Sequence, residues 1–239
     1  MLKDLLNRVL ELSEIRTFER DGNLYSKNNS GAVYRLRDPE QCPPTQLVFN
    51  NLSGITNYLG NVEYDNGKMF YAVISPTEVS LMSSPDPLNE NEQFTFAKAI
   101  MGLENFRFDQ WHNLEEFIIQ LLGRFEVTED RDTTIEVLGK LANETVIQNT
   151  DDKFSQSVMI KTGLTTKATV DIENPVSLRP FRTFREVDQP QSDFILRYQT
   201  KNGSMSAALF EGDGGAWQLG AIQNIKEWLT KNTKIPVIG

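Results

Sequence analysis

Hydrophobic residues recur along the chain with two different periods, and these periods separate helical from extended segments. Between Leu2 and Leu12 they are spaced three or four residues apart, which predicts a short amphipathic helix. The same spacing returns after Asn113, after Glu129 and after Gly215. Between these segments, runs rich in β-branched and aromatic residues alternate with short turn sequences, a pattern typical of antiparallel strands. The order of the segments predicts an α+β fold, in which an antiparallel β-sheet packs with helices.

The first half of the chain is expected to hold short strands and one helix. Its expected elements are strands within 18–37 and at 46–49, a helix at 52–59 capped by Ser53, and a hairpin over 68–82. A polar loop with two prolines, 83–93, follows these elements. We expect a boundary at this loop, with an N-terminal helix and β-hairpin subdomain over 1–88 and a main α+β core over 94–239.

The second half shows helical spacing twice before it turns to strands. Asn113 is placed to cap the first of these helices, and a second helix is expected to start within Glu129–Asp132. Strand-like runs then follow one another from 144 to 211, and a glycine turn at 212–215 leads into a final helix. The apolar positions of that helix are expected to face the core, and the tail from Thr230 is expected to be loose.

The balance of charge is acidic. The 239 residues include 24 Lys and Arg against 33 Asp and Glu, a formal net charge of −9, and 39% of the chain is hydrophobic. The hydrophobic share is ordinary for a globular protein. The negative charge argues against broad, phosphate-driven binding of nucleic acid, but it leaves room for a local basic surface. A basic partner or mimicry of nucleic acid stays open beside the simpler interpretation that acidity aids solubility.

The scarcity of cysteine and histidine limits the available chemistry. Cys42 is the only cysteine, so no disulfide can form within the chain and a reducing compartment is expected. His112 is the only histidine, which removes any metal site with two histidines. Because no nucleophile motif accompanies either residue, we expect no enzyme activity and no cofactor. The first residues lack the apolar core of a signal peptide, and no stretch is apolar enough to cross a bilayer, which predicts a cytoplasmic protein.

Two clusters carry a functional alternative beside a structural one. Acidic residues gather at the start of a predicted helix, namely Glu126, Glu129, Asp130 and Asp132. The helix dipole stabilises carboxylates there, and a Mg²⁺ or Ca²⁺ site is the alternative. The run 211–215, Glu-Gly-Asp-Gly-Gly, lies between a strand and a helix, where exposed amides can hold a phosphate. Its carboxylates would repel one, so we favour glycines with positive φ that let Trp217 pack under the sheet.

One segment combines basic and aromatic side chains in this acidic chain. Its arginines and phenylalanines are Arg179, Phe181, Arg182, Phe184 and Arg185. Arginine planes and aromatic rings can stack on bases and hold a single strand by its backbone, so these residues form the candidate nucleic-acid-binding site. The competing and more common arrangement is a network of ion pairs with carboxylates such as Glu186 and Asp188. Buried aromatics and paired arginines would exclude the nucleic-acid interpretation of this segment.

Four phrases of the sequence carry a resemblance to known proteins. They are ISPTEVSL at 74–81, FRFDQWHNLEEFIIQLLGRFEVTEDRD at 106–132, SLRPFRTFREVDQPQSDFILR at 177–197 and ALFEGDGGAW at 208–217. Through them the chain resembles a family of bacteriophage and prophage proteins of Gram-positive bacteria, and more distantly the YfdQ-like prophage proteins of enterobacteria. The resemblance covers roughly 52–229 and implies a shared fold without catalytic residues. Where the family pattern has alanine this chain has Gly212, which loosens the turn.

The resemblance also implies a gene among the early replication and recombination genes of a phage. The leading hypothesis is therefore a non-enzymatic phage early protein that acts by binding, as a DNA replication or recombination accessory. Its partner would be a DNA-processing protein of phage or host, or single-stranded DNA. The alternative is a counter-defence protein that inhibits a host nuclease or sequesters a nucleotide signal in a pocket. In both cases we expect a homo-oligomer in the cytoplasm of the infected or lysogenic host cell, away from the membrane.

Overall fold

The computed structural model divides the chain into two compact units, 1–45 and 46–239. The residues that the structure describes are 16–20, 23–27, 30–36, 46–60, 69–85, 91, 93–102, 106–143, 145–151, 156–162, 166–201 and 204–239. The helix predicted over 2–12 and the single cysteine, Cys42, lie outside these residues.

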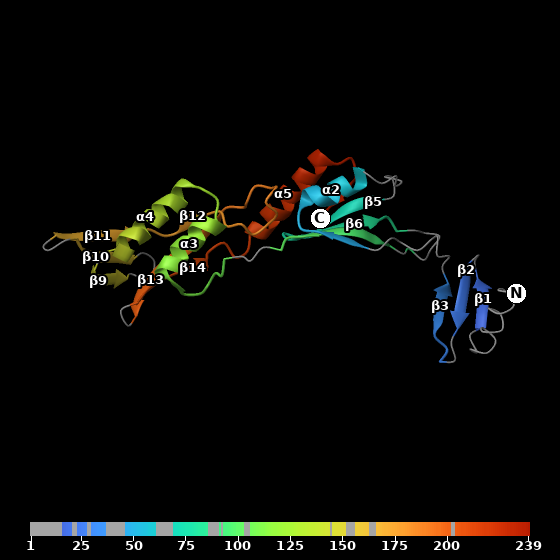
Figure 1. Ribbon diagram of the computed structural model, residues 1–239, viewed down its shortest axis with the longest axis horizontal. Helices are drawn as coiled ribbons and strands as arrows, with labels where there is room; N and C mark the ends of the chain where they lie inside the picture. Colours follow the sequence, from blue (N-terminus) through green and yellow to red (C-terminus); the bar gives the residue numbers. More distant parts are fainter. Residues whose placement is uncertain are drawn as a thin grey trace. The chain divides into compact units, whose positions relative to one another are not determined.

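The first unit contains a three-stranded antiparallel sheet with the order β1-β2-β3 (Figure 1). Its strands are β1 (Arg16–Arg20), β2 (Asn23–Lys27) and β3 (Val33–Leu36). The register places Phe18 opposite Tyr25, and Lys27 opposite both Arg16 and Val33. The strands predicted within 18–37 are confirmed.

The second unit contains a five-stranded sheet with the order β15-β5-β6-β7-β4. Its strands are β4 (Leu47–Phe49), β5 (Met69–Ser75), β6 (Glu78–Ser83), β7 (Thr95–Ile100) and β15 (Val237–Ile238). The outer strands β4 and β15 run parallel to their neighbours, and the central pairs are antiparallel. The hairpin predicted over 68–82 is confirmed as β5 and β6.

Two helices, α2 (Leu52–Gly60) and α5 (Trp217–Asn232), lie on one face of this sheet (Figure 1). Their apolar sides meet the strands in one core, in which Ile55, Tyr71 and Ile225 are completely buried. Removal of such side chains from water is the main stabilising contribution to the fold. The Tyr71 hydroxyl donates to the Ile55 carbonyl oxygen at 3.3 Å, so its polar end is satisfied inside the core. Burial raises the pKa of Tyr71 to about 12.

The C-terminal tail is ordered, so the prediction of a loose tail from Thr230 was wrong. Helix α5 continues to Asn232, and Ile235 is only 7% exposed. The Tyr71 amide then donates to the Pro236 carbonyl oxygen at 2.8 Å, and β15 pairs with β5. The sequence near the tail contains no sign of this pairing, because the partner strand lies far earlier in the chain.

The N-terminal cap of α2 also differs from the prediction. Asn51, and not Ser53, accepts a hydrogen bond from the Gly54 amide, at 2.6 Å. Glu186 adds a distant cap, because its Oε1 accepts from the amides of Leu52 and Ser53 at 2.9 and 3.1 Å. A carboxylate at this position is stabilised by the partial positive charge of the helix start.

The second unit also contains a four-stranded antiparallel sheet with the order β12-β13-β14-β8. Its strands are β8 (His112–Asn113), β12 (Val176–Leu178), β13 (Ser192–Lys201) and β14 (Ser204–Glu211). Helices α3 (Leu114–Arg124) and α4 (Glu129–Asn143) pack against it, and Phe117, Leu138 and Tyr198 lie in the shared core. Asn113 caps α3 as predicted, since its Oδ1 accepts from the Glu115 amide at 3.0 Å.

The remaining strands form a three-stranded antiparallel sheet, β11-β10-β9. They are β9 (Thr145–Asp151), β10 (Gln156–Thr162) and β11 (Thr166–Ile172). The fold is therefore α+β, as predicted, although the sequence suggested a single sheet and the described residues form four. No helix within the described part of the chain is long and apolar enough to cross a membrane.

The loop at 83–93 joins two neighbouring strands of one sheet. Strands β6 and β7 on either side of it are paired, and the Ser83 amide donates to the Phe94 carbonyl oxygen at 2.8 Å. The structure divides the chain near residue 45 instead, so its compact units differ from the expected subdomains 1–88 and 94–239. Prolines and polar residues predict an exposed loop equally well at a strand connection and at a domain boundary.

Candidate functional site

The predicted basic and aromatic site lies in an irregular segment and not on a strand. Strand β12 ends at Leu178, and the chain forms no further regular element before β13 begins at Ser192. The start of the segment is held by backbone hydrogen bonds. The Phe181 amide donates to the Arg124 carbonyl oxygen, and the Glu126 amide to the Arg179 carbonyl oxygen, both at 2.9 Å. The five candidate residues therefore do not share one face.

Arg182 points into the protein, where its side chain is 3% exposed. Its Nη1 lies 2.5 Å from Oε1 of Glu211, and its Nη2 donates to the Ser192 hydroxyl. The guanidinium carbon is 4.1 Å from the ring centre of Trp217 and 5.3 Å from that of Phe108. The cation lies between aromatic faces with a carboxylate at one end, but Nε of Arg182 and Oδ2 of Asp213 are buried without a hydrogen-bond partner.

Burial lowers the pKa of Arg182 to about 10, against the opposing effect of the negative charges on Glu211 and Asp213. The guanidinium therefore stays charged at neutral pH. Because it is buried, its partners must provide the stabilisation of the positive charge that solvent water would otherwise provide. The ring of Trp217, which was predicted to pack under the sheet, lies against the Arg182 guanidinium. The predicted positive φ of the glycine turn is confirmed at Gly214 and Gly215, with values of 61° and 85°.

Phe184 is a core residue and is 1% exposed. It packs with the apolar residues of α2, α5 and the five-stranded sheet. The neighbouring Thr183 hydroxyl donates to the Pro76 carbonyl oxygen at 2.5 Å, and the Gln189 side chain donates to the carbonyl oxygens of Phe184 and Val187. This part of the segment therefore anchors the chain in the core.

The other candidate residues are nearer the surface. Arg179 is 42% exposed, and its Nη1 lies 3.6 Å from Oε2 of Glu126. The guanidinium carbon of Arg185 lies 3.5 Å from the ring centre of Phe181, which is half-buried. Of the five candidate residues, Arg185 is exposed, and its guanidinium stacks on the Phe181 ring of the same segment.

These contacts correct the predicted nucleic-acid site. Arg182 and Phe184 are buried, so neither offers a surface to a base or a phosphate. Arg179 lies beside a carboxylate, which leaves Arg185 and Phe181 as a small exposed pair. The structural alternative, ion pairs with carboxylates, describes the segment better, although the partners are Glu211 and Glu126 and not the neighbouring Glu186 and Asp188.

Asp213 completes the surroundings of Arg182. Burial by itself would raise the pKa of Asp213, but hydrogen bonds from Ser192 and the Gly215 amide, with the charge of Arg182, lower it below its ordinary value of 3.8. The folded state therefore favours the ionised carboxylate. This contribution to stability is present above pH 3.8 and is lost as the pH falls through the lowered pKa.

Replacing Asp213 with asparagine is expected to lower the free energy of unfolding at pH 7 by about 1 kcal/mol, the scale of one hydrogen bond. The difference from the wild type should shrink as the pH is lowered below 3.8, because the wild-type carboxylate becomes neutral as well. Urea denaturation of both proteins at pH 7 and at a pH below 3.8 measures this difference in the free energy of unfolding. The exposed Asp188→Asn is the control and should change stability little at either pH. A difference that is the same at both pH values would contradict the prediction.

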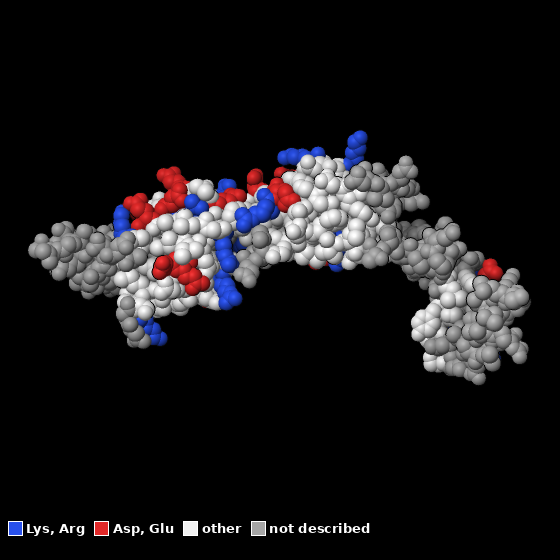
Figure 2. Space-filling view, viewed as in Figure 1, with Lys and Arg blue, Asp and Glu red and all other residues white. Residues whose placement is uncertain are grey.

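The acidic residues near the start of α4 do not converge on one point. Asp132 accepts from the Arg131 guanidinium at 2.7 Å, while Glu126 lies beside Arg179. Among the described residues, no group of three or more histidine, cysteine or acidic side chains is placed to hold a metal ion. Figure 2 shows acidic side chains over α4 with basic ones between them, so this face is not continuously acidic.

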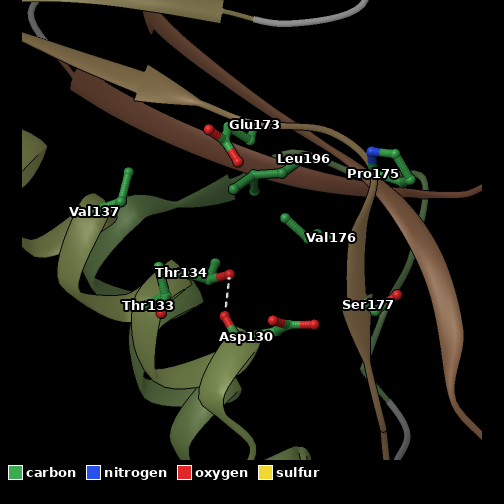
Figure 3. A pocket seen from close by; sticks show the side chains of 9 residues that line it. All are labelled: Asp130, Thr133, Thr134, Val137, Glu173, Pro175, Val176, Ser177 and Leu196. Atoms are coloured by element: carbon green, nitrogen blue, oxygen red, sulfur yellow. Dashed lines mark hydrogen bonds between the residues drawn. The ribbon is translucent and has the colours of Figure 1, made fainter.

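Asp130 instead lines a small cleft of about 360 Å³ between α4 and the strands β12 and β13 (Figure 3). The Thr134 hydroxyl donates to the Asp130 carbonyl oxygen at 2.7 Å and so is used within the helix. Glu173 enters from the opposite side, and Val176 and Leu196 form an apolar wall. The cleft mixes two acidic residues with apolar surface.

A second cleft, of about 560 Å³, lies at the start of α3. Its lining residues are Arg107, Gln110, Trp111, His112, Asn113, Glu116, Gln120 and Arg124. One wall is the segment before α3, which is attached to β14 through the Asp109 amide and the Leu209 carbonyl oxygen at 2.9 Å. The other wall is a polar stripe of α3, since its last three lining residues are four positions apart.

The sheet of the first unit has two different faces. Residues opposite each other and residues two apart on a strand share a face. By this rule one face carries Arg16, Phe18, Arg20, Tyr25, Lys27 and Val33. Phe18 and Tyr25 stack on each other with ring centres 5.5 Å apart, and Phe18 is 39% exposed. We call this the basic-aromatic face.

The opposite face carries Leu24, Tyr34 and Leu36, with Glu19 as its acidic residue. Sequence reasoning identified the strands but missed their chemistry. The signal was available, because basic and aromatic residues stand at every second position of 16–20 and again at 25 and 27. A period of two places them on one side of the sheet. The segment Arg179–Arg185, in contrast, was predicted as a site only because its arginines and phenylalanines lie close together in the sequence.

Comparisons with known proteins add no relative. No family model, no curated protein and no solved structure matches this chain.

Proposed function

We propose that this chain is a non-enzymatic phage early protein that binds single-stranded DNA and assists replication or recombination. The phage origin rests on the sequence resemblance. The observation that supports DNA binding is the basic-aromatic face, where two stacked rings are flanked by Arg16, Arg20 and Lys27. Aromatic rings stack on bases whatever their identity, and the neighbouring cations hold the phosphates.

The placement of this face agrees with an acidic chain. The formal net charge of −9 would repel DNA from most of the surface, so binding requires a local site. On the basic-aromatic face the described charged residues are all positive, and Glu19 lies on the other side of the sheet. A sheet of short strands with the exposed ring of Phe18 and the half-buried ring of Tyr25 also admits unpaired bases, whereas the paired bases of a duplex are not free to stack on it.

The test is fluorescence anisotropy of a labelled single-stranded oligonucleotide of about 16 nucleotides with the full chain. We expect saturable binding, and the logarithm of the association constant should fall with the logarithm of salt concentration with a slope of about −1.4, because Arg16 and Lys27 meet the strand. The triple variant Arg16→Gln, Arg20→Gln, Lys27→Gln should lose most of this slope. Tyr25→Ala should weaken binding about tenfold, the contribution of one stacked base.

The matched control is Tyr34→Ala, which removes the same ring from the opposite face of the same sheet. It should leave the affinity unchanged. Equal losses in Tyr25→Ala and Tyr34→Ala would mean that both act through the stability of the sheet, and would contradict the proposed face. Failure of the wild type to bind any single strand at low salt would overturn the function, and would direct the search to a DNA-processing protein as the partner.

A further inference from the structure

The cleft at the start of α3 combines three kinds of chemistry that one small molecule can use together. Two arginines, Arg107 and Arg124, lie on its two walls, and Glu116 is its single acidic residue. Oε1 of Glu116 already accepts from the Gln120 amide nitrogen at 2.9 Å. The formal charge of the lining is therefore positive, and the Arg107 guanidinium is a donor suited to phosphate oxygens.

An aromatic surface stands beside these cations. Trp111 lines the cleft and is 44% exposed. Its ring meets Phe210 edge-on, with ring centres 6.3 Å apart and an interplanar angle of 76°. Because Phe210 supports one side of the indole, the ring is held in place while part of its surface stays open. An exposed, supported tryptophan is suited to stack on a planar ring.

The floor of the cleft is rigid. His112 is buried, and its Nε2 lies 2.7 Å from the carbonyl oxygen of Arg107. A carbonyl oxygen only accepts, so Nε2 carries the proton, and the histidine ties the backbone of Arg107 to the strand β8. The tilted contact between the rings of His112 and Phe106, with ring centres 4.9 Å apart, joins this floor to the core. The backbone that carries Arg107 is therefore held in place beside the cleft.

Side-chain amides supply the remaining contacts. Gln110, Asn113 and Gln120 line the cleft, and each amide can both donate and accept, as the edges of nucleobases require. The carboxylate of Glu116 can accept from sugar hydroxyls. A volume of about 560 Å³ is within the range of sites for small ligands. We propose that this cleft binds a free nucleotide, with its phosphate on Arg107 and its base on Trp111.

This site is independent of the proposed DNA-binding function, since the cleft belongs to unit 46–239 and the basic-aromatic face to unit 1–45. It gives a specific location to one ligand that the sequence left open, a nucleotide signal. A polar cleft rich in amides and cations fits a phosphorylated, planar ligand better than it fits an apolar ligand.

Isothermal titration calorimetry of the full chain with AMP and with GMP tests the proposal, and adenosine and inorganic phosphate are the comparison ligands. We expect saturable binding of at least one nucleotide with a Kd below about 1 mM, and weaker binding of adenosine and of phosphate. Arg107→Gln and Trp111→Leu should each raise that Kd about tenfold. The control Lys201→Gln removes a positive charge from an exposed residue outside the cleft and should leave the Kd unchanged.

Three results would overturn the proposal. The first is the absence of saturable binding for both nucleotides, and the second is binding of phosphate alone as tight as that of the nucleotides. The third is a Kd that Tyr25→Ala raises and Trp111→Leu does not, which would place the nucleotide on the basic-aromatic face. Loss of DNA binding in Tyr25→Ala with unchanged nucleotide binding is the expected pattern. The two functions can therefore fail separately.

Discussion

Replacing Arg182 with alanine is expected to lower the free energy of unfolding by about 3 kcal/mol, because it removes a buried guanidinium from its ion pair with the partly exposed Glu211. The loss has two sources. Glu211, within 2.5 Å of the guanidinium, and Asp213 would remain close together without the cation between them. The rings of Trp217 and Phe108 would also lose the planar group that they enclose. Urea denaturation at pH 7 measures the change.

Arg185→Ala is the matched control, because it removes the same side chain from the same segment at an exposed position. Its cost should be below about 1 kcal/mol, as for surface interactions generally. Arg182→Ala combined with Glu211→Gln should destabilise less than the sum of the single changes, since the second removes one of the charges that the first leaves unpaired. Similar small losses for Arg182→Ala and Arg185→Ala would show that Arg182 is not buried as the structure describes.

The sequence predicted elements well where a local period was strong. Phe117 and Leu121 recur at helical spacing after a capping asparagine, and both are buried in α3. The period is less reliable for single positions, because Leu122 and Leu219 fit the apolar pattern of their helices and are 55% and 75% exposed. A helix of 3.6 residues per turn buries a stripe whose width depends on the surface it meets, and the sequence does not describe that surface.

Pairings between distant segments could not be predicted. Helix α5 packs with α2 and the five-stranded sheet, although the sequence placed it in a main core over 94–239, apart from α2 and the hairpin β5–β6. The apolar face of α5 contains Ile225 and Leu229, and such a face fits any apolar surface of suitable shape. The pairing of β15 with β5 and the capping of α2 by Glu186 also join segments that lie far apart in the sequence.

The candidate site illustrates the same limit for charged residues. Within the segment Arg179–Arg185 the arginines look available, because their sequence neighbours include few carboxylates. The partner of Arg182 is Glu211, which follows 29 residues later in the chain. In a chain with 33 acidic and 24 basic residues, each arginine has a high chance of meeting a carboxylate on folding. The overall excess of acidic residues therefore predicted the pairing of Arg182 better than its sequence neighbours did.

Replacing Phe184 with alanine is the second change expected to have a large effect, with a loss of about 3–5 kcal/mol in the free energy of unfolding. The ring is 1% exposed and packs in the core that joins α2, α5 and the five-stranded sheet. Its removal leaves a cavity as well as lost burial, because Tyr71 and Ile225 are completely buried neighbours in that core and cannot move far to fill the space. Thermal and urea denaturation of the variant measure the loss.

Phe181→Ala makes the comparison decisive, because the two phenylalanines lie three positions apart and differ in burial. Phe181 is half-buried and has the Arg185 guanidinium on its ring, so its removal should cost less than about 1.5 kcal/mol. Neither change should alter the affinity for single-stranded DNA of protein that remains folded, since the proposed contacts lie on the basic-aromatic face. A loss of DNA binding in stable Phe181→Ala would restore the exposed pair Arg185 and Phe181 as a contact. A small stability loss in Phe184→Ala would mean that the segment leaves the core in solution, and the site first predicted from the sequence would then become accessible.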